Sequence, residues 1–551
     1  MASGKAWNRR AAVIGGASVA VGAAWALWPR HDRQRVQIAD AHTLRRGNSA
    51  EPETLDNSLS SADGDDIIIG DLMTGLVTED VAARPIAGMA TTWKNSPDGL
   101  TWNFKLREAV WSDGVPVTAE DFVFSWRRLL DPTTAARYSN YLYLVKNAEP
   151  VNAGKLPPGA LGVRAVTGRE LEVRLEHPAP YLLQMLMHPC THPLPRHVVT
   201  AKGKNWSRPG NHVGNGAFVL KEWLPNGHVL VEKNPRFYDA ANVALERIFY
   251  YPTDDYSAAL QRMRAGELDM QTRIAVQRID WIRKNLPQIL HPQSVFSVEF
   301  VYINVRRPPF HDVRVREALN LALNREAIAQ RIRRVGDVPA YSLVPPNIAN
   351  FAHGNSFAFK TMAPQARIER ARALMQAAGF SETNRLNTTF LIRSTAPGPY
   401  RAVAAAIQQM MAQIHINLSI VPMDFAVFLA QTHSHNFDLA ESGWVADFDD
   451  AATFLELLQT GNGNNDGEYS NPAYDQLLAA AQQDTDLISR GRKLAQAEAL
   501  ALKDHAILPL FFWVDPNMVW PYVKGWQVNG MDKHRSRWIS IDQPARIKQF
   551  T

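Results

Sequence analysis

The stretch from Thr101 to Trp126 constrains the fold of this chain more than any other part of the sequence. Apolar and polar residues alternate over 101–106, which predicts a half-buried β-strand. Ser112-Asp113-Gly114 then predicts a turn. Thr118 stands three residues before Asp121, a spacing typical of a capped helix start. We therefore expect a strand, a turn and a helix that follow one another closely.

The length and composition of the chain limit its possible architecture. A chain of 551 residues is too long for one hydrophobic core, so we expect two or three packed units. The 59 basic and 54 acidic residues are interspersed, with no long basic block outside the N-terminus, which argues against nucleic-acid binding. Cys190 is the single cysteine, which excludes an intramolecular disulfide and a thiolate-rich zinc site.

The N-terminal segment 1–41 has the layout of an export signal. Arg9-Arg10 precedes an uncharged run over 11–28, as in a signal peptide, and the arginine pair resembles that of a twin-arginine signal. Small residues would allow cleavage after Ala41. Three arginines between 30 and 35 favour the alternative, an uncleaved segment that tethers the protein to the outer face of the inner membrane. Both alternatives place the remaining chain in the periplasm.

Downstream periodicity predicts alternating strands and helices. Strands are expected over 161–175 as a pair, from 215, over 299–304, over 388–392 and over 415–421. Helices are expected after Asp312 and over 365–377, 400–413 and 488–503. This alternation is that of a mixed α/β protein.

Two sequence blocks resemble the periplasmic oligopeptide-binding proteins, the family 5 extracytoplasmic solute receptors of ABC peptide importers. The first runs from Asp98 to Trp126 and contains WSDGVPVTAEDFVFSW. The second, FDLAESGWVADFD, runs from Phe437 to Asp449. The resemblance covers roughly residues 42–545.

The resemblance implies an α/β fold, that of a large two-lobed periplasmic binding protein of class II type with an additional third lobe. The implied lobes are built from discontinuous segments: lobe I from 42–75, 200–296 and 516–551, the extra lobe II from 76–199, and lobe III from 297–515. The lobes of such a receptor would close on the ligand about a hinge.

The resemblance also implies the positions of ligand-binding residues. Asp447 would hold the α-ammonium of a peptide, and the main chain of Gly443, Trp444 and Val445 would pair with the ligand as an added β-strand. Tyr141 would line the ligand side of the extra lobe. From the residues alone, Asp447 is more typical of a turn acid in the polar run Asp447, Asp449 and Asp450. The same acids could form a hard-cation site, although the sequence specifies no compatible further ligands nearby.

The chain differs from the family at the positions that hold the C-terminal carboxylate of a tripeptide ligand. An arginine six residues before the aspartate is replaced by Glu441, and a further arginine and a histidine are replaced by Thr432 and Pro399. A carboxylate at 441 would repel the ligand C-terminus. We therefore hypothesise longer peptides, a carboxylate held by Arg401 or Arg273, or a modified peptide with extra positive charge. Both arginines are otherwise typical of the surface.

We interpret the chain as a monomeric receptor that passes peptides to the permease and ATPase subunits of an ABC importer. It is expected to need no cofactor and to carry no catalytic residue. Alternatives with the same fold are a receptor for a nickel chelate, haem, an oligosaccharide or a murein peptide, and an alternative from another class is a cell-wall peptide hydrolase. No nucleophile elbow, phosphate loop or His-Glu-x-x-His motif supports an enzyme. The residues that come nearest to a metal-ligand set are His188, Cys190, His192 and His197, although proline-rich turns rarely fix such geometry.

Overall fold

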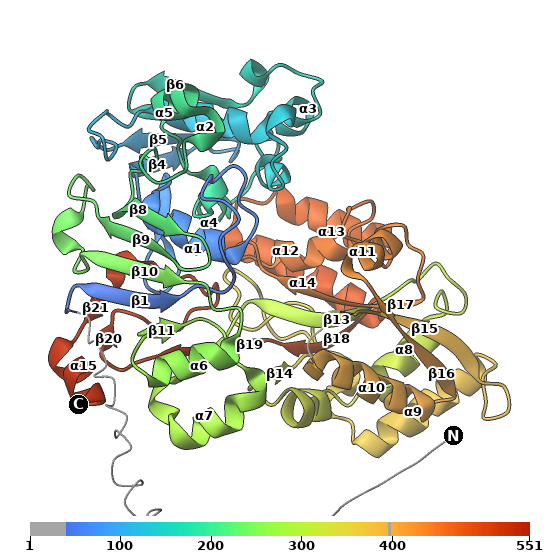
Figure 1. The fold of residues 1–551 in the computed structure, drawn as a ribbon. Coiled ribbons are helices and arrows are strands. Elements are labelled where there is room, and N and C mark those ends of the chain that lie inside the picture. Colours follow the sequence, from blue (N-terminus) through green and yellow to red (C-terminus); the bar gives the residue numbers. More distant parts are fainter. Residues whose placement is uncertain (1–39, 395–397) are drawn as a thin grey trace, which may run out of the picture.

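The computed structural model describes residues 40–394 and 398–551, which form several sheets surrounded by helices (Figure 1). The predicted signal or anchor segment lies almost entirely outside these residues. Within the described ranges, no helix combines the length and apolar character needed to cross a bilayer. The predicted class, a mixed α/β protein with more than one packed unit, is confirmed.

A seven-stranded sheet collects strands from distant parts of the chain. Its central strand β1 is parallel to both neighbours, β10 and β11, and the other pairs are antiparallel. Four helices lie in the same parts of the chain as the strands of this sheet: α1 (Asp63–Leu72), α6 (Tyr256–Arg264), α7 (Ile279–Asn285) and α15 (Gln543–Phe550). The strand order is β12 (Leu290–Ser294), β19 (Val514–Val519), β11 (Met270–Gln271), β1 (Thr43–Gly47), β10 (Arg247–Tyr251), β9 (His228–Lys233) and β8 (Phe218–Leu224).

A six-stranded sheet forms the second large unit, and buried apolar clusters cover both of its faces. Its order is β14 (Val338–Pro339), β18 (Ile507–Phe512), β13 (Ser297–Ile303), β17 (Leu439–Val445), β15 (Leu386–Arg393) and β16 (Ile416–Met423). Its helices are α8 (Val313–Ala322), α9 (Pro364–Ala377), α10 (Gly398–Ala412), α11 (Phe425–His433), α12 (Ala452–Leu455), α13 (Pro472–Gln482) and α14 (Leu487–Lys503). Asp312 caps α8 through the Arg314 N–H, as predicted.

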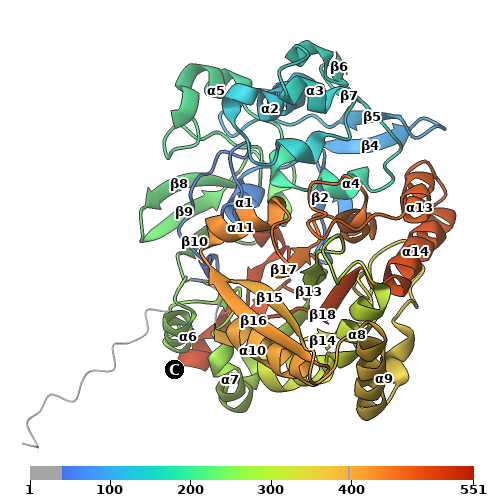
Figure 2. The same ribbon diagram turned by 90° about the vertical axis from the view of Figure 1, so that its right-hand side faces the viewer.

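A four-stranded sheet occupies one end of the molecule in both views (Figures 1 and 2). It contains the predicted strand 101–106, whose apolar residues are buried, and the capped helix: the Asp121 carboxylate accepts the Thr118 N–H at 2.8 Å. The strand order is β4 (Ala90–Asn95), β5 (Thr101–Leu106), β7 (Glu170–Arg174) and β6 (Val163–Thr167); the helices are α2 (Ala119–Leu130), α3 (Ala148–Asn152), α4 (Leu182–Met185) and α5 (Arg196–Lys202). Two-stranded ribbons join β2 (Val77–Glu79) to β3 (Pro85–Ala87) and β20 (Val523–Lys524) to β21 (Ser540–Ile541).

The chain passes between the two large sheets at two adjacent places, from β12 to β13 and from β18 to β19. The two crossings contact each other: the Val295 N–H donates to the Trp513 carbonyl at 3.2 Å, and the Trp513 N–H donates to the Ser297 hydroxyl at 3.3 Å. A pair of short crossings is the geometry of a hinge. The predicted lobe boundaries stay a prediction.

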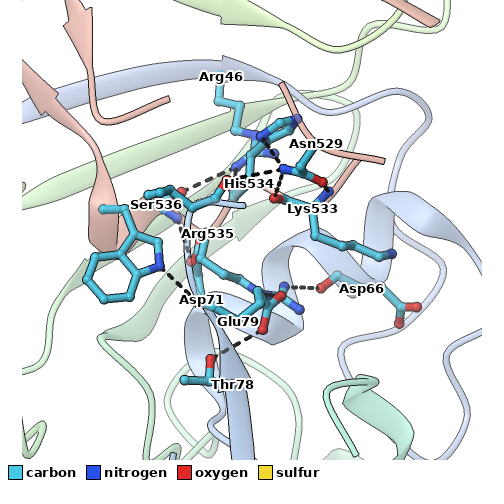
Figure 3. A network of polar contacts seen from close by, with 12 residues as sticks. Arg46, Asp66, Asp71, Thr78, Glu79, Asn529, Lys533, His534, Arg535 and Ser536 are labelled. Atoms are coloured by element: carbon cyan, nitrogen blue, oxygen red, sulfur yellow. Dashed lines mark hydrogen bonds and ion pairs between the residues drawn. The ribbon is translucent and has the colours of Figure 1, made fainter. Parts of the chain in front are cut away.

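A buried polar network ties the C-terminal segment to the start of the chain (Figure 3). Arg46 donates to the His534 carbonyl, and the Asp71 carboxylate accepts the Ser536 N–H. Arg535 pairs with Glu79, and these side chains are 6% and 3% exposed. The first and last segments therefore stabilise each other.

We expect the change Arg535→Ala to lower the free energy of unfolding by about 3 to 5 kcal/mol, because it leaves the buried Glu79 carboxylate without its cation. Urea unfolding followed by circular dichroism measures this change. The matched control is Arg169→Ala, which breaks the pair with Glu108 whose side chains are 57% and 83% exposed. The control should change stability by less than about 1 kcal/mol. Equal unfolding midpoints for the two variants would contradict the expectation.

Candidate functional site

One edge of strand β17 is only partly covered. On one side β13 pairs with all residues from Leu439 to Val445, whereas on the other side β15 pairs only with Leu439 and Ala440. Within the described ranges, no strand pairs with residues 441–445 on that second side, and we call this stretch the open edge. Its free N–H and C=O groups can pair with an added strand.

The three acids that follow β17 have different surroundings. Asp450 accepts two hydrogen bonds from Arg490, at 2.6 and 2.8 Å, and both side chains are 2% exposed. Asp449 accepts the Ala349 N–H at 2.8 Å. Across the part of the chain that the structure describes, no side chain forms a hydrogen bond or close ion pair with the Asp447 carboxylate. The turn role therefore fits Asp449 and Asp450, and Asp447 is the acid available to a ligand.

Asp447 lies between two cavities. The first is lined by Val445 and Ala446 and by residues of segments 49–67, 272–273 and 513–533. The second is lined by Trp444 and by Tyr141, Tyr143 and Tyr181, which lie in the same part of the chain as the four-stranded sheet. Val445 and Trp444 line different cavities because consecutive strand residues point to opposite faces.

The charge environment of Asp447 suits a cationic ligand group. Removal of water by the surrounding protein raises the pKa of Asp447 to about 6, and Lys533 opposes this only in part. Figure 3 shows Lys533 and Asp66 at the side of the buried network, and both residues line the first cavity. A partly desolvated carboxylate without a partner is a place where a bound cation is stabilised.

Tyr141 reaches the site from a short 3₁₀ turn, Ser139–Leu142. Its hydroxyl donates to the Asp447 carbonyl at 3.4 Å, and its ring centroid lies 4.8 Å from that of His188. Tyr141 also lines the second cavity. The structure therefore places Tyr141 beside Asp447, while its contact with a ligand stays a prediction.

Glu441 is buried and already paired. Its carboxylate accepts the Arg393 guanidinium at 2.9 Å and the Arg393 backbone N–H at 3.1 Å. Glu299 lies close by; burial raises its pKa, and the charge of Glu441 raises it further. Sequence reasoning missed Arg393 because only the fold brings it to Glu441, 48 residues away along the chain.

Gly443 is needed for packing within the protein. A Cβ atom at this position would lie 2.8 Å from Oε2 of Glu299 and 2.9 Å from Cζ2 of Trp513. The Trp513 indole N–H also donates to Glu299 at 3.1 Å. The close approach that the glycine permits is therefore made by protein side chains, in addition to any approach by a ligand.

The two alternative arginines have protein partners. Arg273 lines the first cavity and pairs with Asp63 at 2.9 Å and Asp515 at 3.7 Å. Arg401 donates to the Ser394 carbonyl and lines neither cavity. Thr432 is buried in α11, and Pro399 lies in the first turn of α10.

The residues considered as metal ligands are separated. His197 pairs with Asp113 at 2.7 Å, whereas His188 lies 3.3 Å from Asp66. Burial lowers the pKa of His192 to about 3. In residues 40–394 and 398–551, no group of three or more His, Cys, Asp or Glu side chains is placed to hold a metal ion.

Comparisons with known proteins agree with this geometry. The family model for bacterial extracellular solute-binding proteins, family 5 (middle), matches residues 84–466. The periplasmic oligopeptide-binding protein OppA of Salmonella typhimurium is 35% identical over 496 residues, which cover 89% of this chain and 91% of that protein. The probable deoxycholate-binding periplasmic protein YgiS of Escherichia coli is 33% identical over 495 residues, covering 89% and 92%.

Two solved structures superpose over most of the chain. Haemophilus influenzae OppA in complex with RPPGFSPFR has a TM-score of 0.76 and 32% identity, covering 92% of this chain and 100% of that one. The Escherichia coli murein tripeptide binding protein MppA has a TM-score of 0.78 and 30% identity, covering 92% and 99%. The predicted fold class is thus confirmed, and the chain belongs to family 5 of the bacterial extracellular solute-binding proteins.

Proposed function

We propose that this protein captures peptides outside the cytoplasm and delivers them to the permease and ATPase of an ABC importer. The observation that carries the proposal is the open edge of β17, which ends beside the unpartnered carboxylate of Asp447. An extended peptide can add to this edge through main-chain hydrogen bonds, which do not depend on its sequence. Its α-ammonium then pairs with Asp447.

Similarity to known proteins supports a peptide ligand, but similarity alone does not identify the ligand of this protein. An oligopeptide-binding and a deoxycholate-binding relative are 35% and 33% identical to this chain. The open edge favours a ligand with its own main chain. The Asp447 carboxylate favours a ligand cation and repels an anion such as deoxycholate. A peptide meets both requirements.

The remaining parts of the proposal concern closure and location. Gly443, Trp444 and Val445 provide the main chain along which the ligand lies, and Tyr141 borders its first residue. The paired crossings between the large sheets allow lobes I and III to close over it. The protein acts in the periplasm as a monomer, after export by its N-terminal segment, and binds its ligand without chemical change.

We expect Asp447→Asn to weaken the binding of a tetra-alanine peptide by about 2 to 5 kcal/mol, or on the order of thirtyfold or more, because the ligand ammonium loses its counter-charge. Isothermal titration calorimetry measures the affinity. Asp449→Asn is the matched control and should bind like the wild type, since an amide oxygen can still accept the Ala349 N–H. Wild-type affinity in Asp447→Asn would refute the assigned role.

The same variant should not lose stability. Because the pKa of Asp447 is raised above its unfolded value, ionisation of this carboxylate destabilises the folded state as pH rises from about 4 to 6. Asp447→Asn should therefore melt at the same temperature as the wild type or higher at about pH 8. A lower melting temperature would mean that the loss of binding reflects misfolding.

Peptide affinity should fall as pH is lowered through about 6. Below this pH the free protein holds a proton on Asp447, and binding an ammonium requires that proton to leave, so affinity decreases by up to about tenfold per pH unit. Calorimetry between about pH 8 and 5 tests this, with Asp447→Asn as the variant in which the dependence should be largely absent. A flat wild-type profile would contradict it.

We expect an amidated tripeptide to bind at least as tightly as its free acid, since Arg393 is already paired with Glu441. Glu441→Gln should strengthen the binding of the free-acid tripeptide relative to that of the amide, because the change frees Arg393 to pair with the ligand carboxylate. The ratio of the two dissociation constants in each protein is the readout. Equal changes for acid and amide would show that position 441 does not sense the ligand C-terminus.

A further inference from the structure

The second cavity contains a carboxylate that the proposed peptide contacts do not use. Glu456 begins a 3₁₀ turn, Glu456–Leu458, immediately after α12. The side chain is partly buried and lines the cavity together with Asp447. In the described part of the chain, no hydrogen bond or close ion pair to the Glu456 carboxylate is found.

The neighbouring charges leave Glu456 without a cation of its own. Arg490 is the nearby positive side chain, and two of its nitrogens bind Asp450. That pair is neutral overall, so Arg490 offsets the charge of Glu456 only in part, as Lys533 does for Asp447. The described lining of the cavity includes no lysine or arginine, and the His177 ring contacts Gln482 at 2.9 Å.

The walls of the cavity suit a long aliphatic side chain with a polar end. The rings of Tyr181 and Phe448 are stacked with centroids 4.7 Å apart, and Trp444 adds a further apolar surface. Aromatic faces pack against methylene groups and attract a cation above the ring. The remaining described lining includes side-chain amides that can accept hydrogen bonds, at Asn140, Gln459, Asn462, Asn464 and Gln482.

The position of Asp447 connects this cavity to the start of the ligand. Asp447 lines both cavities, and the open edge runs from it past Val445 along the first cavity. In a peptide the α-ammonium and the first side chain are attached to the same Cα. An ammonium held by Asp447 therefore places the first side chain within reach of the second cavity, which Glu456 also lines.

We propose that the second cavity receives the side chain of the first ligand residue and that Glu456 selects a positively charged side chain there, such as that of lysine. This inference rests on the proposed peptide-binding function and adds a preference to it. A cationic end group would neutralise Glu456, while the aromatic walls would hold its aliphatic stem.

Calorimetry with peptides of the form X-Ala-Ala-Ala tests the preference, where X is lysine or the uncharged norleucine. The measurements are made at about pH 8 because burial raises the pKa of Glu456 to about 7. The wild type should bind the lysine peptide about tenfold more tightly or better. In Glu456→Gln the two affinities should become nearly equal, through weaker binding of the lysine peptide only.

The controls separate this role from general electrostatics. Glu382→Gln removes the same charge from an exposed side chain outside both cavities and should keep the wild-type ratio. A peptide with lysine at its third position should bind Glu456→Gln and the wild type alike. Unchanged binding of the norleucine peptide shows that Glu456→Gln is folded. The ratio of the two affinities in the wild type tests the preference without any variant.

Equal wild-type affinities for the two peptides, or a ratio that Glu456→Gln leaves unchanged, would overturn the inference. If the norleucine peptide still bound in an Asp447-dependent way, the proposed peptide-binding function would stand and only the lysine preference would fail. If the wild type bound no peptide, both would fail.

Discussion

The unequal pairing of β17 is the constraint on which the site depends. β13 holds the strand along its whole length, while β15 leaves it after Ala440. An exposed strand edge can pair with another chain and promote aggregation. The open edge lies beside a cavity within the fold, which limits access by other chains. The loop beyond is fixed by Asp449, by Asp450 with Arg490, and by the stacking of Phe448 on Tyr181. These contacts set the position of Asp447 without using its carboxylate.

Local signals in the sequence predicted local structure well. Alternation and capping located strand β5 and helix α2, because both depend on residues within a few positions of each other. Helix α13 was missed although Asn471 and Pro472 form a recognisable start, in which Asn471 caps and proline occupies the first turn. The open edge, the Arg393 partner of Glu441 and the position of Glu456 in the same cavity as Asp447 could not be predicted, because each depends on which distant segments become neighbours.

The surrounding charges explain how the fold tolerates a glutamate at position 441, where the resemblance predicts an arginine. Glu441 and Glu299 are buried side by side, and Arg393 supplies the compensating charge. Burial and the charge of Glu441 raise the pKa of Glu299, which favours a proton on Glu299. The surroundings of Glu441 are therefore close to neutral, whereas Glu456 is repelled by both Asp450 and Asp447. The electrostatic surroundings of positions 441 and 447 therefore differ.

The order of strands in the seven-stranded sheet has a consequence for synthesis. β12 joins the sheet only through β19, which begins at Val514, and the first segment is held by Arg535 near the end of the chain. A nascent chain that stops before these residues lacks both the strand and the network that complete this sheet. Strand β12 can therefore join this sheet only after the residues from Val514 onward have been made, although β1, β10 and β11 can pair before then.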